Sequence, residues 1–231
     1  MSGLPIVFVP GLMCTGRIYQ HQAEQLGQGR AVLLANHWSH DSMAAIAASI
    51  LEAAPARFAL AGTSMGGYVA FEILRQAPER VETLILMSTS ARPDTPERSV
   101  GRRQQVAWAR RNGMRAGTLA AYPPLVHPAR HEDLSLRTTF IEMAEALGVD
   151  AFARQIEAII GRPDSRADLP GIGIPTLVIV GADDQLIPPE HGQEIAAGIP
   201  GARFERVEHC GHMGMIELPE TYTRLIGDFL A

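Results

Sequence analysis

Short apolar runs alternate along this chain with longer segments of helical periodicity, and this alternation constrains the fold more than any other feature. The apolar runs lie at residues 6–9, 31–34, 58–61, 83–87 and 176–180, and a last β-type run lies at 202–207. Runs of this length without polar alternation are typical of strands that are buried on both faces, as in a parallel sheet. Helical periodicity lies between them, for example over residues 43–54, 66–76 and 220–230. The alternation therefore predicts a doubly wound α/β fold.

One stretch interrupts the alternation of strands and helices. Between approximately residues 91 and 169 the pattern is helical throughout, over about 97–112, 131–147 and 150–160, with prolines between the helices. Because 231 residues suit one domain with an insertion better than two domains, we expect residues 1–231 to form a single domain, with 91–169 inserted as a helical cap over the strand ends. The arginines of the first cap helix are interpreted as a solvated face, with capture of an anion or of substrate as the alternative; they are Arg98, Arg102, Arg103, Arg110 and Arg111.

The composition excludes several chemistries and classes of partner. All 20 basic residues are arginine, so the chain has no lysine for a Schiff base, a covalently anchored pyridoxal phosphate or a P-loop. Two cysteines, Cys14 and Cys210, are too few for a disulfide framework or a cysteine-rich metal site. A formal net charge of −5 predicts no nucleic-acid partner, and no apolar stretch reaches the ~20 residues of a membrane span. With no pattern of a signal peptide, a cytoplasmic location is expected.

Residues 62–67, Gly-Thr-Ser-Met-Gly-Gly, contain the motif Gly-x-Ser-x-Gly around Ser64. An apolar run precedes the motif and a helical pattern follows it, which is the strand-turn-helix context of a nucleophile elbow. Glycines at 62 and 66 remove side chains that would collide across so sharp a turn. The helix N-terminus would present the Met65 N–H to a developing oxyanion. The alternative is an ordinary tight turn in which Ser64 caps the helix.

A serine nucleophile needs a histidine base and an acid that orients it. His209 and His212 follow the β-type run at 202–207, and Asp183 and Asp184 follow the apolar run at 176–180. The resulting chain order, serine then aspartate then histidine, is the order described for α/β-hydrolases. Asp94, near the end of the run at 83–87, is a fallback acid.

Four segments together resemble the α/β-hydrolase fold family, in its serine-esterase-like form with a helical cap, and they span nearly the whole chain. These segments are Val9-Pro10-Gly11-Leu12, the elbow at Ser64, Gly181-x-x-Asp184-x-x-x-Pro188, and Gly211-His212 followed by Glu217-x-Pro219. The resemblance implies that the acid is Asp184 rather than Asp183, and that the base is His212 rather than His209. It also implies that the Leu12 N–H is the second oxyanion donor.

The sequence departs from the family pattern in two places. Only one apolar run precedes the Pro10-Gly11 loop, so the usual leading hairpin is absent and about six parallel strands are expected. The segment 36–41, after the second run, lacks the common Arg-Gly-His-Gly pattern. It holds His37, His40 and Asp41, which we interpret as polar surface rather than as metal ligands.

The residues and the resemblance together predict a serine hydrolase that cleaves small, uncharged esters or lactones through an acyl-enzyme, without a cofactor or a metal. Ser64 would be the nucleophile, His212 the base and Asp184 the orienting acid. Three alternatives remain open: an enol-lactonase or carbon-carbon bond hydrolase, which a cap arginine in the pocket would favour; a cofactor-independent perhydrolase; and a ligand receptor on the same scaffold. Cys14 and four large cap residues are interpreted mainly as core residues, and one or two of the cap residues are expected to face substrate. The four are Trp108, Phe140, Met143 and Phe152.

Overall fold

The computed structural model describes residues 3–231 of the chain. Six strands form one sheet in the order β2-β1-β3-β4-β5-β6, and every neighbouring pair is parallel. The strands are β1 (Gly3–Val9), β2 (Arg30–Leu34), β3 (Phe58–Thr63), β4 (Val81–Met87), β5 (Thr176–Gly181) and β6 (Arg203–Val207). The predicted α/β fold with about six parallel strands is confirmed.

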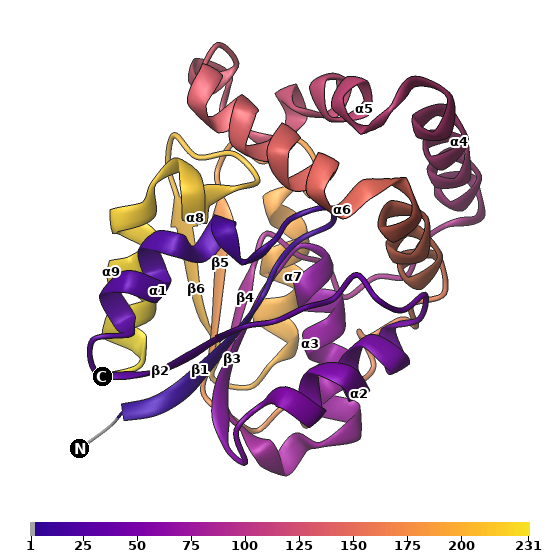
Figure 1. Cartoon of the computed structure of the whole chain (residues 1–231). Coiled ribbons are helices and arrows are strands. Elements are labelled where there is room, and N and C mark those ends of the chain that lie inside the picture. The colour runs from indigo at the N-terminus through magenta and orange to yellow at the C-terminus, as the bar shows by residue number, and fades with distance from the viewer. Residues whose placement is uncertain (1–2) are drawn as a thin grey trace.

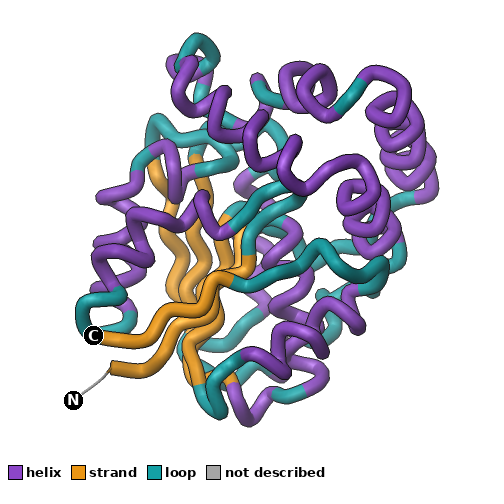
Figure 2. Tube along the Cα trace, in the orientation of Figure 1, coloured by secondary structure: helices purple, strands orange, loops and turns teal. Residues whose placement is uncertain are grey.

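Helices cover both faces of this sheet (Figure 1). On one face lie α2 (Met43–Ala53), α3 (Met65–Gln76) and α7 (Pro189–Gly198). On the other face lie α1 (Gln20–Leu26), α8 (Gly214–Glu217) and α9 (Pro219–Phe229). Figure 2 shows the strands as a single layer between these two groups of helices.

The two faces of the sheet are buried in two separate hydrophobic clusters, which explains why the central strands β3 and β5 are buried at every position. Val7 and Val9 of β1 pack into the cluster that contains the apolar faces of α2 and α3. Ile6 and Phe8 of the same strand pack into the cluster that contains residues of α9. Successive side chains of a strand point to opposite faces, so a strand that is covered twice needs an apolar residue at every position.

Three further helices lie beyond the carboxyl ends of the strands (Figure 1). They are α4 (Pro96–Asn112), α5 (Met114–Ala121) and α6 (Leu134–Ile160). Gly148, at φ 76 and ψ 171, breaks α6, and this break separates the two helical patterns expected over 131–147 and 150–160. The short helix α5 is not predicted by the sequence pattern, because a single residue, Gly113 at φ 83, turns the chain between α4 and α5. None of the helices in residues 3–231 is both long enough and apolar enough to cross a membrane.

The strand order places a crevice between β1 and β3. From β1 the chain first adds β2 on one side, and all later strands are added on the other side. The loops that leave β1 and β3 therefore diverge at the carboxyl ends of neighbouring strands. In open α/β sheets this reversal point is where ligands bind, so the Pro10-Gly11 loop and Ser64 lie at the expected position for a site.

Candidate active site

Ser64 occupies a strained turn between β3 and α3. Its φ is 54° and its ψ is −116°, a backbone conformation that costs a non-glycine residue about 1–3 kcal/mol. Glycine is required on both sides of it. A Cβ on Gly62 would lie 2.4 Å from the Gly66 carbonyl oxygen, and a Cβ on Gly66 would lie 2.0 Å from the Val9 carbonyl oxygen. The turn therefore has the shape of a nucleophile elbow, which presents the serine side chain at the end of the sheet.

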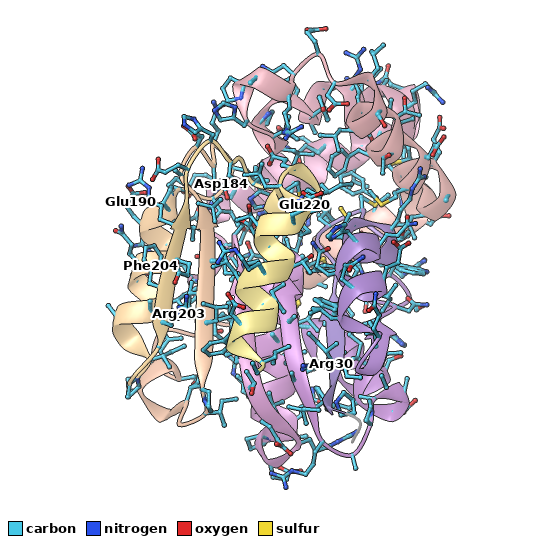
Figure 3. The ribbon with its side chains drawn as sticks, turned by 90° about the vertical axis from the view of Figure 1, so that its left-hand side faces the viewer. Arg30, Asp184, Glu190, Arg203, Phe204 and Glu220 are labelled. Atoms are coloured by element: carbon cyan, nitrogen blue, oxygen red, sulfur yellow. The ribbon has the colours of Figure 1, made fainter. Side chains whose placement is uncertain are left out.

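Asp184 and His212 form a buried hydrogen-bonded pair. The Nδ1–H of His212 donates to Oδ2 of Asp184 at 2.7 Å, and both side chains are almost wholly inaccessible to solvent. The other carboxylate oxygen, Oδ1, accepts from the N–H groups of Leu186 and Ile187 at 2.9 Å each. Figure 3 shows Asp184 at the end of the sheet that faces the helices α4 to α6. The pair thus fixes the histidine tautomer that leaves Nε2 able to accept a proton.

Ser64, His212 and Leu12 line one cavity of about 710 Å³. The loop of residues 10–12 lies against the elbow, since a Cβ on Gly11 would lie 3.5 Å from the Ser64 Cβ. Within residues 3–231 the N–H groups of Leu12 and Met65 have no hydrogen-bond partner. Leu12 lines the cavity, whereas Met65 is buried and does not line it.

Glu217 holds the loop that carries His212, a role that the sequence pattern does not reveal. Its buried carboxylate accepts from three backbone N–H groups: those of His127 at 2.7 Å, Gly211 at 3.3 Å and Met213 at 3.1 Å. Burial raises the pKa of Glu217, and the three N–H donors act against that rise. Because two of these donors flank His212 and the third belongs to the 91–169 segment, one carboxylate fixes both segments.

The large residues of the 91–169 segment divide between the cavity and the core. Trp108, Phe140 and Phe152 line the cavity, as does Cys14. Met143 does not line it; this side chain is buried, and its sulfur accepts from the Thr15 N–H at 3.4 Å. Three of the four cap residues thus line the cavity and the fourth belongs to the core.

Two arginines of α4 depart from the interpretation of that helix as a solvated face. Arg98 and Arg102 line the cavity, and the Arg102 guanidinium lies 3.0 Å from the carboxylate of Asp94. Asp94, the fallback acid, is thus paired with arginine, while Asp184 contacts the histidine. Arg103 fits the expectation, since it forms an exposed ion pair with Glu157 at 2.8 Å. The helical period shows which arginines share a face of α4, but it does not show which face of the helix adjoins the cavity.

His37 corrects the interpretation of segment 36–41 as polar surface. His40 and Asp41 are exposed, but His37 is buried. Its Nε2–H donates to the Gly11 carbonyl at 2.9 Å, which leaves Nδ1 buried without a partner in the described chain. Residues 3–231 contain no group of three or more His, Cys, Asp or Glu side chains arranged to hold a metal ion. His37 therefore anchors the loop next to Ser64 through a hydrogen bond to its backbone.

The His37 anchor is expected to make stability fall as pH falls. Burial lowers the pKa of His37 to about 4, and the Gly11 carbonyl opposes this effect only partly. The unfolded chain then binds more protons than the folded chain between about pH 6.5 and pH 4. The contribution of His37 to the free energy of unfolding is fully present above that pH range. It falls by about 2 kcal/mol as the pH is lowered from 7.5 to 5.

Urea unfolding of wild type and of His37→Gln at the two pH values measures this loss, because glutamine keeps an N–H donor and does not titrate. The pH-dependent part should shrink in His37→Gln and persist in His40→Asn, which removes an exposed histidine of the same segment. Equal pH dependence in all three proteins would contradict the assignment.

Comparison with known proteins agrees with the fold. The family model described as "Alpha/beta hydrolase family" matches residues 6–225. A thermophilic esterase from Thermogutta terrifontis, solved with malate bound, is 29% identical, with a TM-score of 0.92 over 99% of this chain and 90% of that chain. The enol-lactonase from Burkholderia xenovorans LB400 is 25% identical, with a TM-score of 0.88 over 100% of this chain and 92% of that chain.

A curated relative extends the comparison to a third activity. The pimeloyl-[acyl-carrier protein] methyl ester esterase of Nitrosomonas europaea is 26% identical over 223 residues, which cover 89% of this chain and 82% of that protein. The relatives thus share the fold but differ in the compound on which they act. With a family match over most of its length, this chain belongs to the alpha/beta hydrolase family and is a hydrolase of that family.

Proposed function

We propose that this protein is a serine hydrolase that cleaves small carboxylic esters through an acyl-enzyme. One observation carries the proposal: the hydrogen-bonded Asp184–His212 pair and the strained Ser64 meet at a single cavity. A serine, an acid-oriented histidine and free backbone donors are what acyl transfer to water requires. Esterases among the relatives, at 29% and 26% identity, support this choice of reaction.

In the proposed reaction, each group acts at a defined atom. His212 Nε2 removes the proton of Ser64 as its Oγ attacks the ester carbonyl, and the same nitrogen then protonates the leaving alcohol. Asp184 holds the Nδ1–H tautomer and stabilises the imidazolium as it forms. The N–H groups of Leu12 and Met65 bind the developing oxyanion. Water, activated by His212, then releases the acid from Ser64.

Residues 91–169 are proposed to act as a cap that sets substrate choice. Side chains from α4, α5 and α6 line the cavity together with Ser64 and His212. Because the residues of the acid-base pair come from loops after β5 and β6, the cap can vary the cavity wall without supplying a catalytic group.

A cytoplasmic location stays a prediction from the sequence.

A lactonase is the second candidate function. The same nucleophile, base and oxyanion donors would open a cyclic ester, with the leaving alcohol remaining attached to the acid. The cap arginines that line the cavity favour it, as does the 25% identity to an enol-lactonase. A comparison of kcat/KM for δ-valerolactone and methyl pentanoate separates the two candidates.

Covalent labelling tests the proposed nucleophile directly. We expect diethyl p-nitrophenyl phosphate to add one diethylphosphoryl group to each chain, on Ser64, as measured by intact mass and peptide mass spectrometry. Ser90 also lines the cavity, so Ser90→Ala is the matched control and should be labelled like wild type. Labelling that persists in Ser64→Ala, or that maps to Ser90, would overturn the assignment of the nucleophile.

A further inference from the structure

Arginines dominate the charged lining of the cavity that contains Ser64. Arg92, Arg98, Arg102 and Arg162 all line it, and no aspartate or glutamate of residues 3–231 does so. The positive charge of Arg92 is compensated, because the carboxylate of Glu194 accepts two hydrogen bonds from its guanidinium, at 2.9 and 3.1 Å. The other three arginines of the lining are Arg98, Arg102 and Arg162.

Among these three arginines, ion pairs form with only one carboxylate of the described residues, that of Asp94. The buried Asp94 side chain accepts from Arg102 at 3.0 Å through Oδ2 and from Arg162 at 3.2 Å through Oδ1. Burial acts to raise the pKa of Asp94, but the two guanidinium groups outweigh it and hold this pKa below its ordinary value. Arg98 has no ion-pair partner within the described chain. The three guanidinium groups that line the cavity thus have a single carboxylate as ion-pair partner among them, so positive charge is in excess in this cluster.

Tyr68 joins this cluster to the candidate nucleophile. It follows Ser64 by four residues on α3, about one helical turn or 6 Å along the helix axis, and both residues line the cavity. The Arg162 guanidinium lies 4.3 Å from the centre of the Tyr68 ring. Burial raises the pKa of Tyr68, and the charges of Arg162, Arg102 and Arg98 oppose the rise. Its hydroxyl, which has no hydrogen-bond partner in residues 3–231, is a neutral donor beside these charges.

We propose that Arg98, Arg102 and Tyr68 bind a carboxylate of the substrate, so that the preferred substrates are monoesters of short dicarboxylic acids or lactones that carry a carboxylate. This inference rests on the proposed function, because it places the ester at Ser64 and the carboxylate about one helical turn away. A guanidinium and a phenol hydroxyl are donors suited to a carboxylate. The excess of positive charge lowers the cost of removing that carboxylate from water.

The rest of the cavity suits the carbon chain between these two groups. Apolar residues line it, among them Leu125, Phe140 and Phe152. A dicarboxylic monoester has an apolar middle and two polar ends, and the cavity offers an apolar wall with donors at Ser64 and at the arginine cluster. The proposal differs from the expectation from the sequence in that the substrate carries one negative charge.

Kinetics with matched esters test the proposed carboxylate site. Monomethyl glutarate and methyl pentanoate have acyl chains of equal length and differ in a terminal carboxylate or methyl group. Wild type should prefer the best of monomethyl succinate, glutarate and adipate over its matched neutral ester by at least about tenfold in kcat/KM, mainly through KM, since a charge-assisted hydrogen bond contributes about that factor. The preference should weaken as salt screens the partly exposed charges.

Variants of the cluster should reduce this preference. Arg98→Gln is expected to lower the anionic-to-neutral ratio of kcat/KM about tenfold, and Tyr68→Phe to lower it several-fold. Arg103→Gln, on the same helix but paired with Glu157 outside the cavity, should keep the wild-type ratio. Absence of any preference in wild type, or an unchanged ratio in both cluster variants, would overturn the carboxylate site.

Binding without turnover separates failure of this inference from failure of the proposed function. Glutarate, titrated calorimetrically into Ser64→Ala, should bind, and the double variant Ser64→Ala with Arg98→Gln should bind it about tenfold more weakly. Arginine-dependent binding without hydrolysis of any ester would leave the carboxylate site intact and overturn the esterase. Ester hydrolysis that depends on Ser64 without arginine-dependent binding of glutarate would do the reverse.

Discussion

Ser64→Ala is expected to abolish hydrolysis of p-nitrophenyl acetate while the protein stays folded. Loss of a serine nucleophile that acts together with a histidine and an acid costs about 10⁴ to 10⁶ in rate. The variant removes one oxygen from the lining of the cavity and keeps the turn, since alanine meets the same backbone strain as serine at φ 54°. Initial rates, together with a thermal unfolding curve, measure the two parts of this prediction.

Ser90→Ala is the control for the first prediction. Ser90 lines the same cavity, but its hydroxyl bonds to Nδ1 of His191 at 2.7 Å rather than to the acid-base pair. Its loss should leave most of the activity. If Ser64→Ala kept more than about a tenth of the wild-type rate, Ser64 would not be the nucleophile.

Asp184→Asn should lower kcat by about 10⁴. In the variant, the amide oxygen would keep the bonds to the N–H groups of Leu186 and Ile187, which now end on Oδ1. The amide nitrogen would then face His212 Nδ1, and two donors would meet there. The ring would shift to the tautomer with hydrogen on Nε2, which cannot accept the proton of Ser64. Single-turnover kinetics with p-nitrophenyl acetate measure the loss in the acylation step.

The neighbouring aspartate provides a matched control for this second prediction. The Asp183 side chain is 42% exposed and lies 3.7 Å from His127 Nε2 rather than near His212. Asp183→Asn makes the same chemical change one residue away, and we expect a small effect on kcat. Similar losses in both variants would show that the charge of the loop, and not the tautomer of His212, controls the rate.

The sequence predicts most of the sheet because each strand is a local pattern with one explanation. The strands β3 and β5 are buried at every position, and only a sheet covered on both faces makes such a run favourable. The elbow is also local, since Gly62, Ser64 and Gly66 meet within five residues. By contrast, the alternatives Asp183 and Asp184 are adjacent, so the local pattern does not distinguish them and only the resemblance to a family favours Asp184, the residue that bonds to His212 in the structure.

The amino-acid sequence by itself determined the order of strands and helices along the chain, the strained turn at Ser64 and the set of residues able to act with Ser64. Tertiary structure alone decided that His37 is buried under the Gly11 carbonyl, that Glu217 secures the loop of His212, and that Arg98 and Arg102 adjoin the cavity. These depend on contacts between segments apart in the chain: His37 and Gly11 are 26 residues apart, and Glu217 and His127 are 90 residues apart. Local periodicity reports which residues share a face, but only the packing of one element on another determines what that face meets.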